Sequence, residues 1–388
     1  MKFLKNRLIS GISGLVQSEL ASLRRELGGL QSEVSGLHGQ LTALRGGVTR
    51  LRGELAQSTE LVDDLGRPNI NPIWIHARND KFNTWNIKNF GYQLARQLAA
   101  QRPIAQGELI HLPVTSKATR QADMESAWCA YWCAQLGIPV VYHRKIWELC
   151  YLLQTLHDER LLVPGKKGLG FACGREPTPS YLASRGIIVT ATDLDADQVA
   201  GKGWAETGQH ASSIDSLWHP HLVAREQFDK TVSFQFVDMN EIPSSLSGYD
   251  FCWSTCSLEH LGSIAKGLDF IENSLKVLRP GGVAIHTTEY NVDSEGPTID
   301  NWATVLFQRK HIESIADRLI AQGHYVAPLD FDFGDGPMDN FIDLPPYVWD
   351  GMLCDPSSTS KQLHPSHLKL ALDGFACTCF GLMIRKKS

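Results

Sequence analysis

The chain has 388 residues, 43% of them hydrophobic and 20% charged, the composition of an ordinary globular protein with room for two or three domains. Its 37 Lys and Arg residues against 42 Asp and Glu give a formal net charge of -5, so no global basic field favours nucleic acid as the main partner. No stretch approaches the roughly 18 continuous apolar residues that a membrane span needs. The nine cysteines are odd in number and lie in segments predicted as helix or buried strand, which indicates reduced thiols in a cytoplasmic protein.

The first 65 residues are predicted to form a coiled coil. Apolar residues recur at alternating spacings of four and three from residue 16 onward, which is the seam of a heptad repeat. These residues are Val16, Leu20, Leu23, Leu27, Leu30, Val34, Leu37, Leu41, Leu44, Val48, Leu51 and Leu55. In this register Glu19 falls at a g position and Arg24 at an e position, so the two side chains can pair between parallel helices. The pattern therefore predicts a homo-oligomer.

Two features of this segment limit how well it specifies its assembly. Leucine dominates both seam positions, which fixes the number of helices poorly, and seven glycines each weaken the helix by about 1 kcal/mol. The glycines are Gly28, Gly29, Gly36, Gly39, Gly46, Gly47 and Gly53. We expect the segment to be stable only as an assembly. The alternative is a long amphipathic helix that folds back onto its own globular domain.

Residues 1–9 form a short basic segment with three cations and no acid. The heptads follow directly without a cleavage site, so the segment does not fit a signal peptide and secretion is not expected. Basic and apolar residues at helical spacing fit contact with an anionic membrane surface, and a frayed terminus fits equally well. The predicted localisation is cytoplasmic, with peripheral contact at the inner face of the membrane as an option.

Residues 66–165 are rich in tryptophan and polar residues, with helical patterns at 92–100, 125–135 and 145–156. They predict a helical cap that takes part in substrate binding. Within it, His143, Arg144 and Lys145 beside Trp147 suit an anionic or sugar acceptor, and cations whose stems cover core aromatics would give the same pattern.

Residues 166–193 predict the first half of a nucleotide-type fold. An apolar strand at 167–171 leads into a turn that contains Gly174, and Pro177 suits the first turn of a helix. A second buried strand ends in Asp193, nineteen residues after Gly174. In a doubly wound sheet such a turn lets a ligand approach the backbone, and such an acid accepts hydrogen bonds from ribose hydroxyls.

The strand series continues through the rest of the chain. A third strand at 231–237 precedes Asp238 and Met239, and a fourth at 249–254 runs into residues 255–261. An amphipathic helix then stops at the Arg-Pro-Gly-Gly sequence of residues 279–282, and a fifth strand covers 283–288.

Together these marks resemble the class I S-adenosylmethionine-dependent methyltransferases, over residues 166–388. Residues 169–174 are similar to that family's first motif, Asp193 to its ribose acid and Asp238 to its adenine acid, while residues 258–260 and 278–282 are similar to its later landmarks. The resemblance implies a Rossmann-like α/β fold, a seven-stranded sheet with helices on both faces. Its sixth strand would be 325–331, and its seventh, 376–385, would lie antiparallel between the fifth and sixth. Residues 334–374 would form an insertion over the acceptor.

The resemblance also implies S-adenosylmethionine as the cofactor, and it assigns a set of cofactor-binding residues. These are Gly170, Phe171, Gly174, Arg175, Asp193, Leu194, Asp238, Met239, Ser254 and Thr255. Ala172 and Glu176 stand where the family usually has glycines, and Gly170 stands where it often has an acid. We therefore expect the methionine end of the cofactor to be held differently, with Arg175 as one candidate.

Methyl transfer is an in-line displacement, so the enzyme must align the acceptor and help to remove its proton. His260 is the leading candidate for the base, because it follows the fourth strand and an imidazole titrates near neutral pH; the alternative is a helix-start residue bonded to the backbone. Glu259 would orient His260 or cap the helix. Glu289, after the fifth strand, is a second candidate base or a solvated carboxylate. Trp253 is predicted to be core.

No metal is assigned, because His219 and His221 have no cysteine or acid at ligand spacing. The predicted function is O-methylation of a sugar hydroxyl in a bacterial surface polysaccharide or lipid-linked glycan, since residues 174–177 and 257–261 resemble methyltransferases of such pathways. A small-metabolite methyltransferase is an alternative. So is a non-catalytic coiled-coil scaffold with a nucleoside-binding fold, which the departures at Ala172 and Glu176 would suit.

Overall fold

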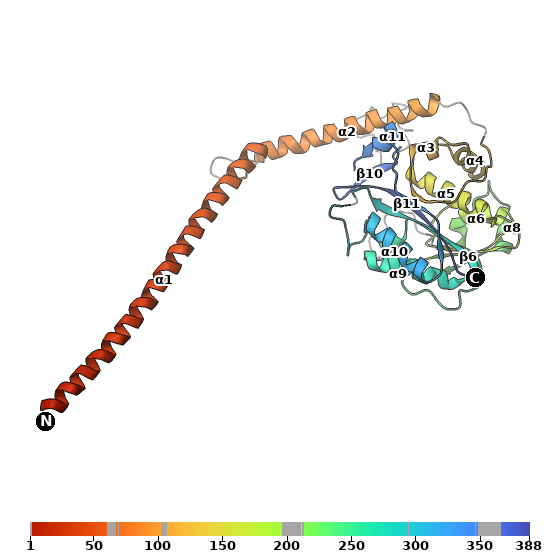
Figure 1. Ribbon diagram of the computed structural model, residues 1–388. Helices are drawn as coiled ribbons and strands as arrows, with labels where there is room; N and C mark the ends of the chain where they lie inside the picture. Colours follow the sequence, from red (N-terminus) through yellow and green to blue (C-terminus); the bar gives the residue numbers. More distant parts are fainter. Residues whose placement is uncertain are drawn as a thin grey trace. The chain divides into compact units, whose positions relative to one another are not determined.

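A computed structural model describes residues 2–59, 67–68, 70–101, 107–195, 211, 213–293, 295–345, 347 and 366–388 (Figure 1). The chain divides into two compact units, Met1–Asn83 and Thr84–Ser388, and the boundary falls within the helix α2 (Ile70–Gln101). Much of the predicted insertion, the junction at 60–66, and the side chains of the basic N-terminal segment lie outside the described residues.

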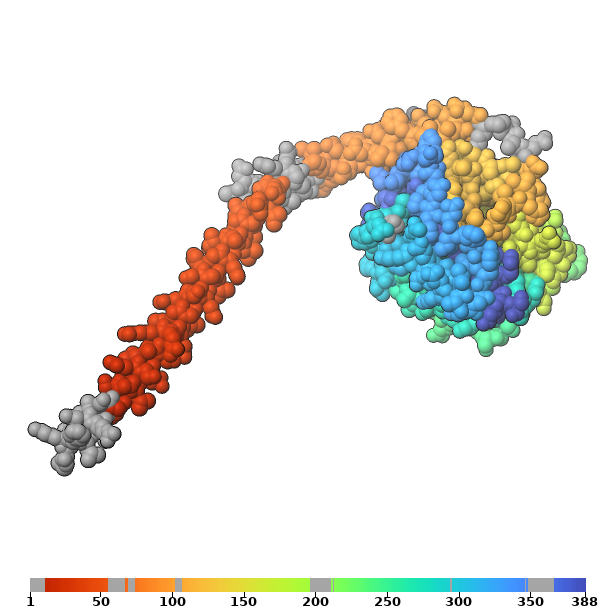
Figure 2. Space-filling model, in the orientation of Figure 1, coloured from red at the N-terminus to blue at the C-terminus, as the bar shows by residue number. Residues whose placement is uncertain are grey.

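The first unit contains α1 (Lys2–Thr59), a single helix of 58 residues that covers the predicted heptads. The seam residues from Val16 to Leu51 are each between 44% and 66% exposed. Figure 2 shows α1 as a rod one helix wide. The helical prediction for this segment is confirmed, and its apolar seam faces solvent in the single chain.

The second unit is built on one mixed sheet, with strand order β4-β3-β2-β5-β6-β11-β1-β8. Its strands are β1 (Ser116–Ala118), β2 (Lys167–Phe171), β3 (Ile188–Asp193), β4 (Val232–Phe236), β5 (Tyr249–Thr255), β6 (Leu278–Asn291), β7 (Tyr325–Val326), β8 (Leu329–Asp330), β9 (Ile342–Asp343), β10 (Lys369–Leu372) and β11 (Phe375–Arg385). Strands β2 to β6 are parallel to one another. The predicted α/β class with a mostly parallel core is therefore confirmed.

Helices cover both faces of this sheet (Figure 1). They are α3 (Gln121–Met124), α4 (Ala127–Leu136), α5 (Arg144–Asp158), α6 (Thr178–Ser184), α8 (Arg225–Thr231), α9 (Ile264–Ser274), α10 (Arg309–Ala321) and α11 (Pro337–Asn340). Helices α4, α5, α6 and α8 share one hydrophobic core with the sheet, and α9 and α10 share a second core on the other face. Apolar residues on both sides of the central strands explain why those strands appear in the sequence as continuous apolar runs.

The last strand of the sheet agrees with its prediction. Strand β11 lies antiparallel beside β6, with Cys377 paired to Asn291 and Arg385 paired to Val283. The strand count differs, because the described residues form eleven strands instead of seven. Most of the additional strands are only two to four residues long.

The predicted sixth strand at 325–331 was wrong as a single element. Its first part is β7, in which Val326 pairs with β11, and its second part is β8, in which Leu329 pairs with β1. The break lies at Pro328, which has no N–H to donate to a neighbouring strand. The carbonyl oxygen of Pro328 instead accepts a hydrogen bond from the backbone N–H of Ser116, at 2.9 Å. The segment therefore changes its partner where β1 enters the sheet.

The predicted cap contributes more to the fold than helices. Its three helical patterns correspond to the end of α2, to α4 and to α5. It also supplies β1, which lies between β11 and β8. Lys88 and Tyr92 of α2 both bind the buried carboxylate of Asp343 in β9, at 2.8 and 2.7 Å. These contacts join the cap to β9 of the insertion, which precedes β11 in the chain.

Among the described helices none is long and apolar enough to cross a membrane. The eight cysteines within the described residues are all buried and form no disulfide.

Candidate functional site

The order of the central strands reverses between β2 and β5. After β2 the chain adds β3 and then β4 on one side of it, and later β5 and then β6 on the other side. In open α/β sheets ligands bind outside the carboxyl ends of the strands, at the point where the order reverses. The candidate site is therefore sought in the segments that follow β2, β3, β4, β5 and β6.

The turn after β2 and the acid that ends β3 contact each other. The backbone N–H of Gly174 donates to Oδ2 of Asp193 at 3.1 Å, and the N–H of Leu194 donates to Oδ1 at 2.8 Å. Gly174 has φ +53°, and Ala172 has φ +48°, although L residues rarely adopt this left-handed region. Strain of this kind concentrates at functional sites.

Packing explains why Gly170 replaces the acid that the resembled family often has. A Cβ at this position would lie 2.3 Å from Sγ of Cys173 and 2.4 Å from the ring of Trp253. No side chain fits there without displacing the indole. Trp253 is fully buried, so its prediction as a core residue is confirmed.

Three other predicted cofactor residues have their side chains in the core. Phe171 packs edge-to-face on Phe270, Met239 is buried in the same core, and Ser254 shares a hydrogen bond of 2.8 Å with Nδ1 of His286. Their backbones still lie at or beside the carboxyl ends of the strands.

Asp238 and Arg175 have side chains outside the core. Oδ1 of Asp238 accepts hydrogen bonds from the backbone N–H and the side-chain amide of Asn240, at 2.8 and 3.1 Å. Arg175 is exposed. Asp238 and Asp193 follow neighbouring strands, because β4 pairs in parallel with β3.

A cluster of buried charged groups lies over the carboxyl ends of β5 and β6. It begins at the start of α5, where Arg144 forms a buried ion pair with Glu289 of β6. Burial acts to lower the pKa of Arg144, but the charge of Glu289 raises it, and the net direction is upward. Cys377 of β11 also contacts Glu289, with 3.5 Å between Sγ and Oε2. Glu289 is therefore ion-paired and buried, not a solvated carboxylate.

Glu148, one turn further along α5, is the second acid of the cluster. It accepts hydrogen bonds from the hydroxyl of Thr287 at 2.5 Å and from the thiol of Cys379 at 2.9 Å. Nζ of Lys145 lies 3.3 Å from its Oε1. Burial alone would raise the pKa of Glu148, but Lys145 and then Arg144 lower it, so the carboxylate is held ionised.

The predicted pair Glu259 and His260 lies beside this cluster, in the short helix η3 (Leu258–His260). Nδ1 of His260 lies 3.1 Å from the carbonyl oxygen of Ala303, a bond that places the proton on Nδ1 and leaves Nε2 as an acceptor. Burial lowers the pKa of His260 to about 3, so the expected titration near neutral pH does not hold. Backbone bonding, one of the two roles predicted for this residue, is therefore present.

Glu259 is fully buried, and its position excludes the predicted capping role. The following helix, α9, is capped by the side chain of Ser263. Oε2 of Glu259 accepts a hydrogen bond from Thr288 at 3.1 Å, and Oε1 lies 3.8 Å from Nε2 of His260. Burial, followed by the charge of Glu289, raises the pKa of Glu259 to about 8. Near neutral pH this group is mostly a neutral acid beside a neutral imidazole.

Sequence reasoning did not place Glu148 and Glu176 in the site. Glu148 follows Lys145 by three residues in a helix that is otherwise largely apolar, and this is the signal that marks it as a buried acid. Glu176 was noted only as a departure from glycine, yet the hydroxyl of Thr255 donates to its Oε1. Both acids lie on segments that meet at the carboxyl ends of the strands.

Side chains of the metal-ligand type also gather here. Cys256, Glu259 and Glu289 place one ligand atom each within 4.8 Å of one another, and so do Glu148, Cys256 and Cys379. Burial, and then Cys379, raises the pKa of Cys256, which opposes the thiolate form that binds metals. Arg144 already supplies a positive charge to Glu289. We therefore assign no metal to this cluster.

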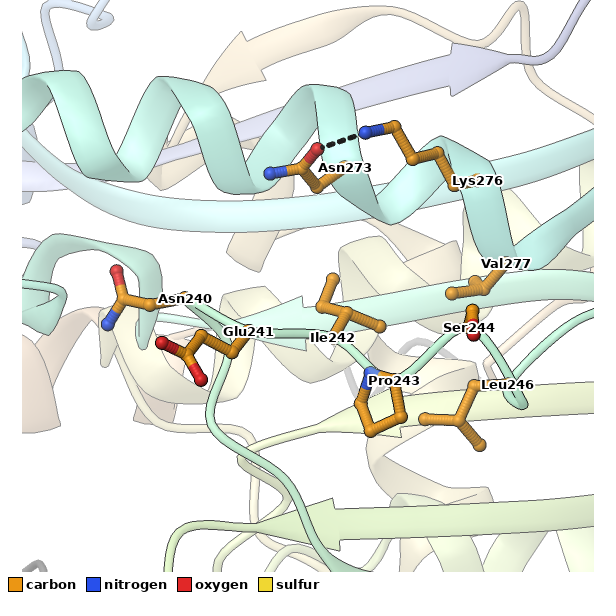
Figure 3. A pocket seen from close by; sticks show the side chains of 9 residues that line it. All are labelled: Asn240, Glu241, Ile242, Pro243, Ser244, Leu246, Asn273, Lys276 and Val277. Carbon is orange, nitrogen blue, oxygen red and sulfur yellow. Dashed lines mark hydrogen bonds between the residues drawn. The ribbon is translucent and has the colours of Figure 1, made fainter.

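A pocket of about 340 Å³ lies elsewhere, between the segment after β4 and the end of α9 (Figure 3). Its lining includes Asn240, Pro243 and Leu246 on one side, and Asn273 and Lys276 on the other. None of the predicted catalytic or cofactor residues lines it. It is therefore not the candidate site.

No protein-family model matches the chain, and no curated protein does. Solved structures that are similar include an S-adenosylmethionine-dependent methyltransferase from Mesorhizobium loti, with 12% identity and a TM-score of 0.31 over 59% of this chain and 96% of its own. The magnesium protoporphyrin IX methyltransferase of Synechocystis, with bound S-adenosylhomocysteine, has 12% identity and a TM-score of 0.34 over 61% of this chain and 80% of its own.

A third similar structure is phosphoethanolamine N-methyltransferase 2 of Haemonchus contortus in complex with S-adenosylmethionine. It has 16% identity and a TM-score of 0.34, over 58% of this chain and 50% of its own. At these identities and TM-scores the fold assignment rests on the strand order and directions of the chain itself.

Proposed function

We propose that the protein is an S-adenosylmethionine-dependent methyltransferase. The observation that carries the proposal is the strand order β4-β3-β2-β5-β6 with an antiparallel β11 beside β6, together with the contact between Gly174 and Asp193 at the point of reversal. This is the arrangement that the resemblance to class I methyltransferases implies.

The residues present fit the cofactor. Asp193 and Asp238 follow adjacent strands and provide acceptors for ribose hydroxyls and for the adenine amino group. The turn at Gly174, with its positive φ, lets a ligand approach the backbone. When bound, the cofactor supplies an electrophilic methyl group on a sulfonium.

We propose that His260 takes the acceptor proton at Nε2, while Ala303 holds the ring through Nδ1. The side chain of His260 is 20% exposed and that of Glu259 is 0% exposed, so an acceptor reaches His260 first. Once ionised, Glu259 would stabilise the imidazolium at 3.8 Å and act as a positioning residue. Glu289, already paired with Arg144, is the weaker candidate for the base.

For the acceptor we propose a sugar hydroxyl of a bacterial surface polysaccharide or its lipid-linked precursor. Arg144, Glu148 and Thr287 are hydrogen-bonding groups at the acceptor side, which suits a hydroxyl-rich ligand. A small metabolite is the second candidate for the acceptor, favoured by the burial of this cluster.

We propose that α1 forms a parallel homo-oligomer through its exposed seam, and that the enzyme works in the cytoplasm at the inner face of the membrane. Deletion of residues 1–65 should leave a folded domain that binds cofactor, with a smaller mass by light scattering. An unchanged oligomer after deletion would move the interface to the globular unit.

The test of the proposed activity uses the full chain with S-adenosylmethionine carrying a labelled methyl group. Lipid-linked glycans and a small-metabolite extract are offered separately as acceptors. Label in an alkali-stable ether of the glycan, with one S-adenosylhomocysteine released per methyl group, supports the proposal. Label in the metabolite fraction would replace the acceptor class. Cofactor binding without release of S-adenosylhomocysteine from any fraction would indicate a scaffold.

A further inference from the structure

Glu176 lies between β2 and α6, where the chain leaves the carboxyl end of a central strand. It lies at the end of the turn after β2, and its Oε1 accepts a hydrogen bond from Thr255 at the end of β5. The two residues therefore bridge the strands between which the order of the sheet reverses. A ligand at this point would pass directly over them.

The second oxygen of Glu176 has unsatisfied hydrogen-bonding capacity. Oε2 is inaccessible to solvent and has no hydrogen-bond partner among the described residues. Leaving a buried carboxyl oxygen unpaired costs free energy. An incoming donor, above all a cationic one, would remove this cost.

The order of the strands indicates which part of the cofactor arrives there. Asp238 follows β4 and Asp193 ends β3, so the proposed contacts to adenine and ribose are two successive steps along the sheet edge. Neighbouring strands lie about 4.8 Å apart, and the next step is the space over β2 and β5. The amino-acid end of the cofactor, which carries an ammonium and a carboxylate, would fall on this step.

Charges of both signs are present at the same place. Burial, and then the charge of Glu148, raises the pKa of Glu176, whereas Lys145 of α5 acts to lower it. An ammonium group bound at Glu176 would likewise favour its carboxylate form. The side chain of Lys145 is 43% exposed, and its Nζ lies 3.3 Å from Oε1 of Glu148, so a ligand carboxylate would share this cation with Glu148. Arg175, the sequence-based candidate for this role, is exposed, and the structure gives its side chain no contact with these residues.

We propose that Glu176 and Lys145 recognise the amino-acid end of S-adenosylmethionine: the carboxylate of Glu176 takes the α-ammonium group, and Lys145 takes the α-carboxylate. This inference rests on the proposed function. It explains why an acid stands at Glu176, where the resembled family has a glycine: the acid for which Gly170 leaves no room is supplied six residues later.

The experiment measures binding by calorimetry on the full chain, with two ligands. S-adenosylhomocysteine carries the amino-acid end, and 5′-methylthioadenosine has the same nucleoside and thioether without it. Glu176→Gln keeps the size of the side chain and should weaken S-adenosylhomocysteine roughly 10- to 100-fold, the range for a hydrogen bond to a charged group. Its affinity for 5′-methylthioadenosine should stay within about twofold. Glu226→Gln, on the exposed face of α8, is the matched control and should change neither affinity.

Equal weakening of both ligands, or no weakening of either, would overturn the inference. If Glu176→Gln does not fold, Lys145→Gln gives the same comparison, because Lys145 is half-exposed: selective loss of S-adenosylhomocysteine supports the inference, and unchanged affinity overturns it. Failure of the wild type to bind either ligand would instead refute the proposed function itself.

Discussion

Different kinds of interaction hold the acidic side chains in the two halves of the candidate site. Over β3 and β4, acids are held by backbone N–H groups and amides close to them in the chain: Gly174 reaches Asp193 across 19 residues. Over β5 and β6, acids are held by cations and thiols from other elements, and Arg144 reaches Glu289 across 145 residues. The half over β3 and β4, here called the nucleoside half, is thus formed by residues close to one another in the chain. The half over β5 and β6, the charged half, forms only after the cap has packed on the sheet. A change in one half should leave the other largely intact.

The largest expected effect is on the charged half. His260→Ala should lower the maximal rate roughly 10²–10⁴-fold with little change in cofactor affinity, because a base acts in the transition state. The measurement is steady-state kinetics with the true acceptor, alongside calorimetry of the cofactor. Glu289→Gln is the comparison variant. If it is the costlier of the two, the base is Glu289, and more than about a tenth of the wild-type rate in His260→Ala would exclude His260.

The pH dependence of the rate sharpens the role of Glu259. Its pKa of about 8 means that the carboxylate, which stabilises the imidazolium of His260, is lost as the pH falls below 8. The wild-type rate should then fall by up to tenfold per pH unit between about pH 8 and pH 6. His260 itself, with a pKa of about 3, adds no step in this range. Glu259→Gln should flatten the profile, and a flat wild-type profile would remove Glu259 from the mechanism.

In the nucleoside half, Asp193→Ala should weaken S-adenosylmethionine by about 1.5–3 kcal/mol, the range for hydrogen bonds to a charged group. Asp317→Ala, on the exposed side of α10, is the matched control. Calorimetry with 5′-methylthioadenosine should show the same loss, since this ligand keeps the ribose. An unchanged affinity in a folded variant would mean that β3 does not carry the ribose acid.

The smallest effect concerns the strained turn after β2. The left-handed conformation of Ala172 costs about 1–2 kcal/mol, and Ala172→Gly removes this cost. The glycine also raises the entropy of the unfolded chain, which lowers stability by about 0.5–1 kcal/mol. The net expectation is a gain of up to about 1 kcal/mol in the free energy of unfolding, measured in urea. Ala130→Gly inside α4 should instead destabilise by about 1 kcal/mol. If both variants lose stability equally, the turn at Ala172 is not strained.

The difference between the halves also explains what the sequence could predict. Strands β2, β3, β5 and β6 are apolar runs bounded by turn residues, so they and the acids that follow β3 and β4 are visible in the sequence. Strand β1 has only the residues Ser-Lys-Ala, which carry no strand pattern. Glu148 and Glu176 look like surface charges until packing buries them. The prediction of a single sixth strand failed for the same reason. The segment divides at Pro328 because β1 enters the sheet there, and β1 has no strand pattern in the sequence.

The place of β1 in the sheet has a consequence for how the chain folds. Ser116 Oγ accepts a hydrogen bond from the backbone N–H of Met383, 267 residues later, and Lys117 pairs with Gly381 in β11. During synthesis the edge of the sheet beyond β6 therefore cannot form until β11 has been made. Contacts of such high sequence separation are slow to form, and meanwhile an unpaired strand edge is exposed. The central parallel strands can therefore pair early in synthesis, whereas β1 of the cap docks only after β11 has been made.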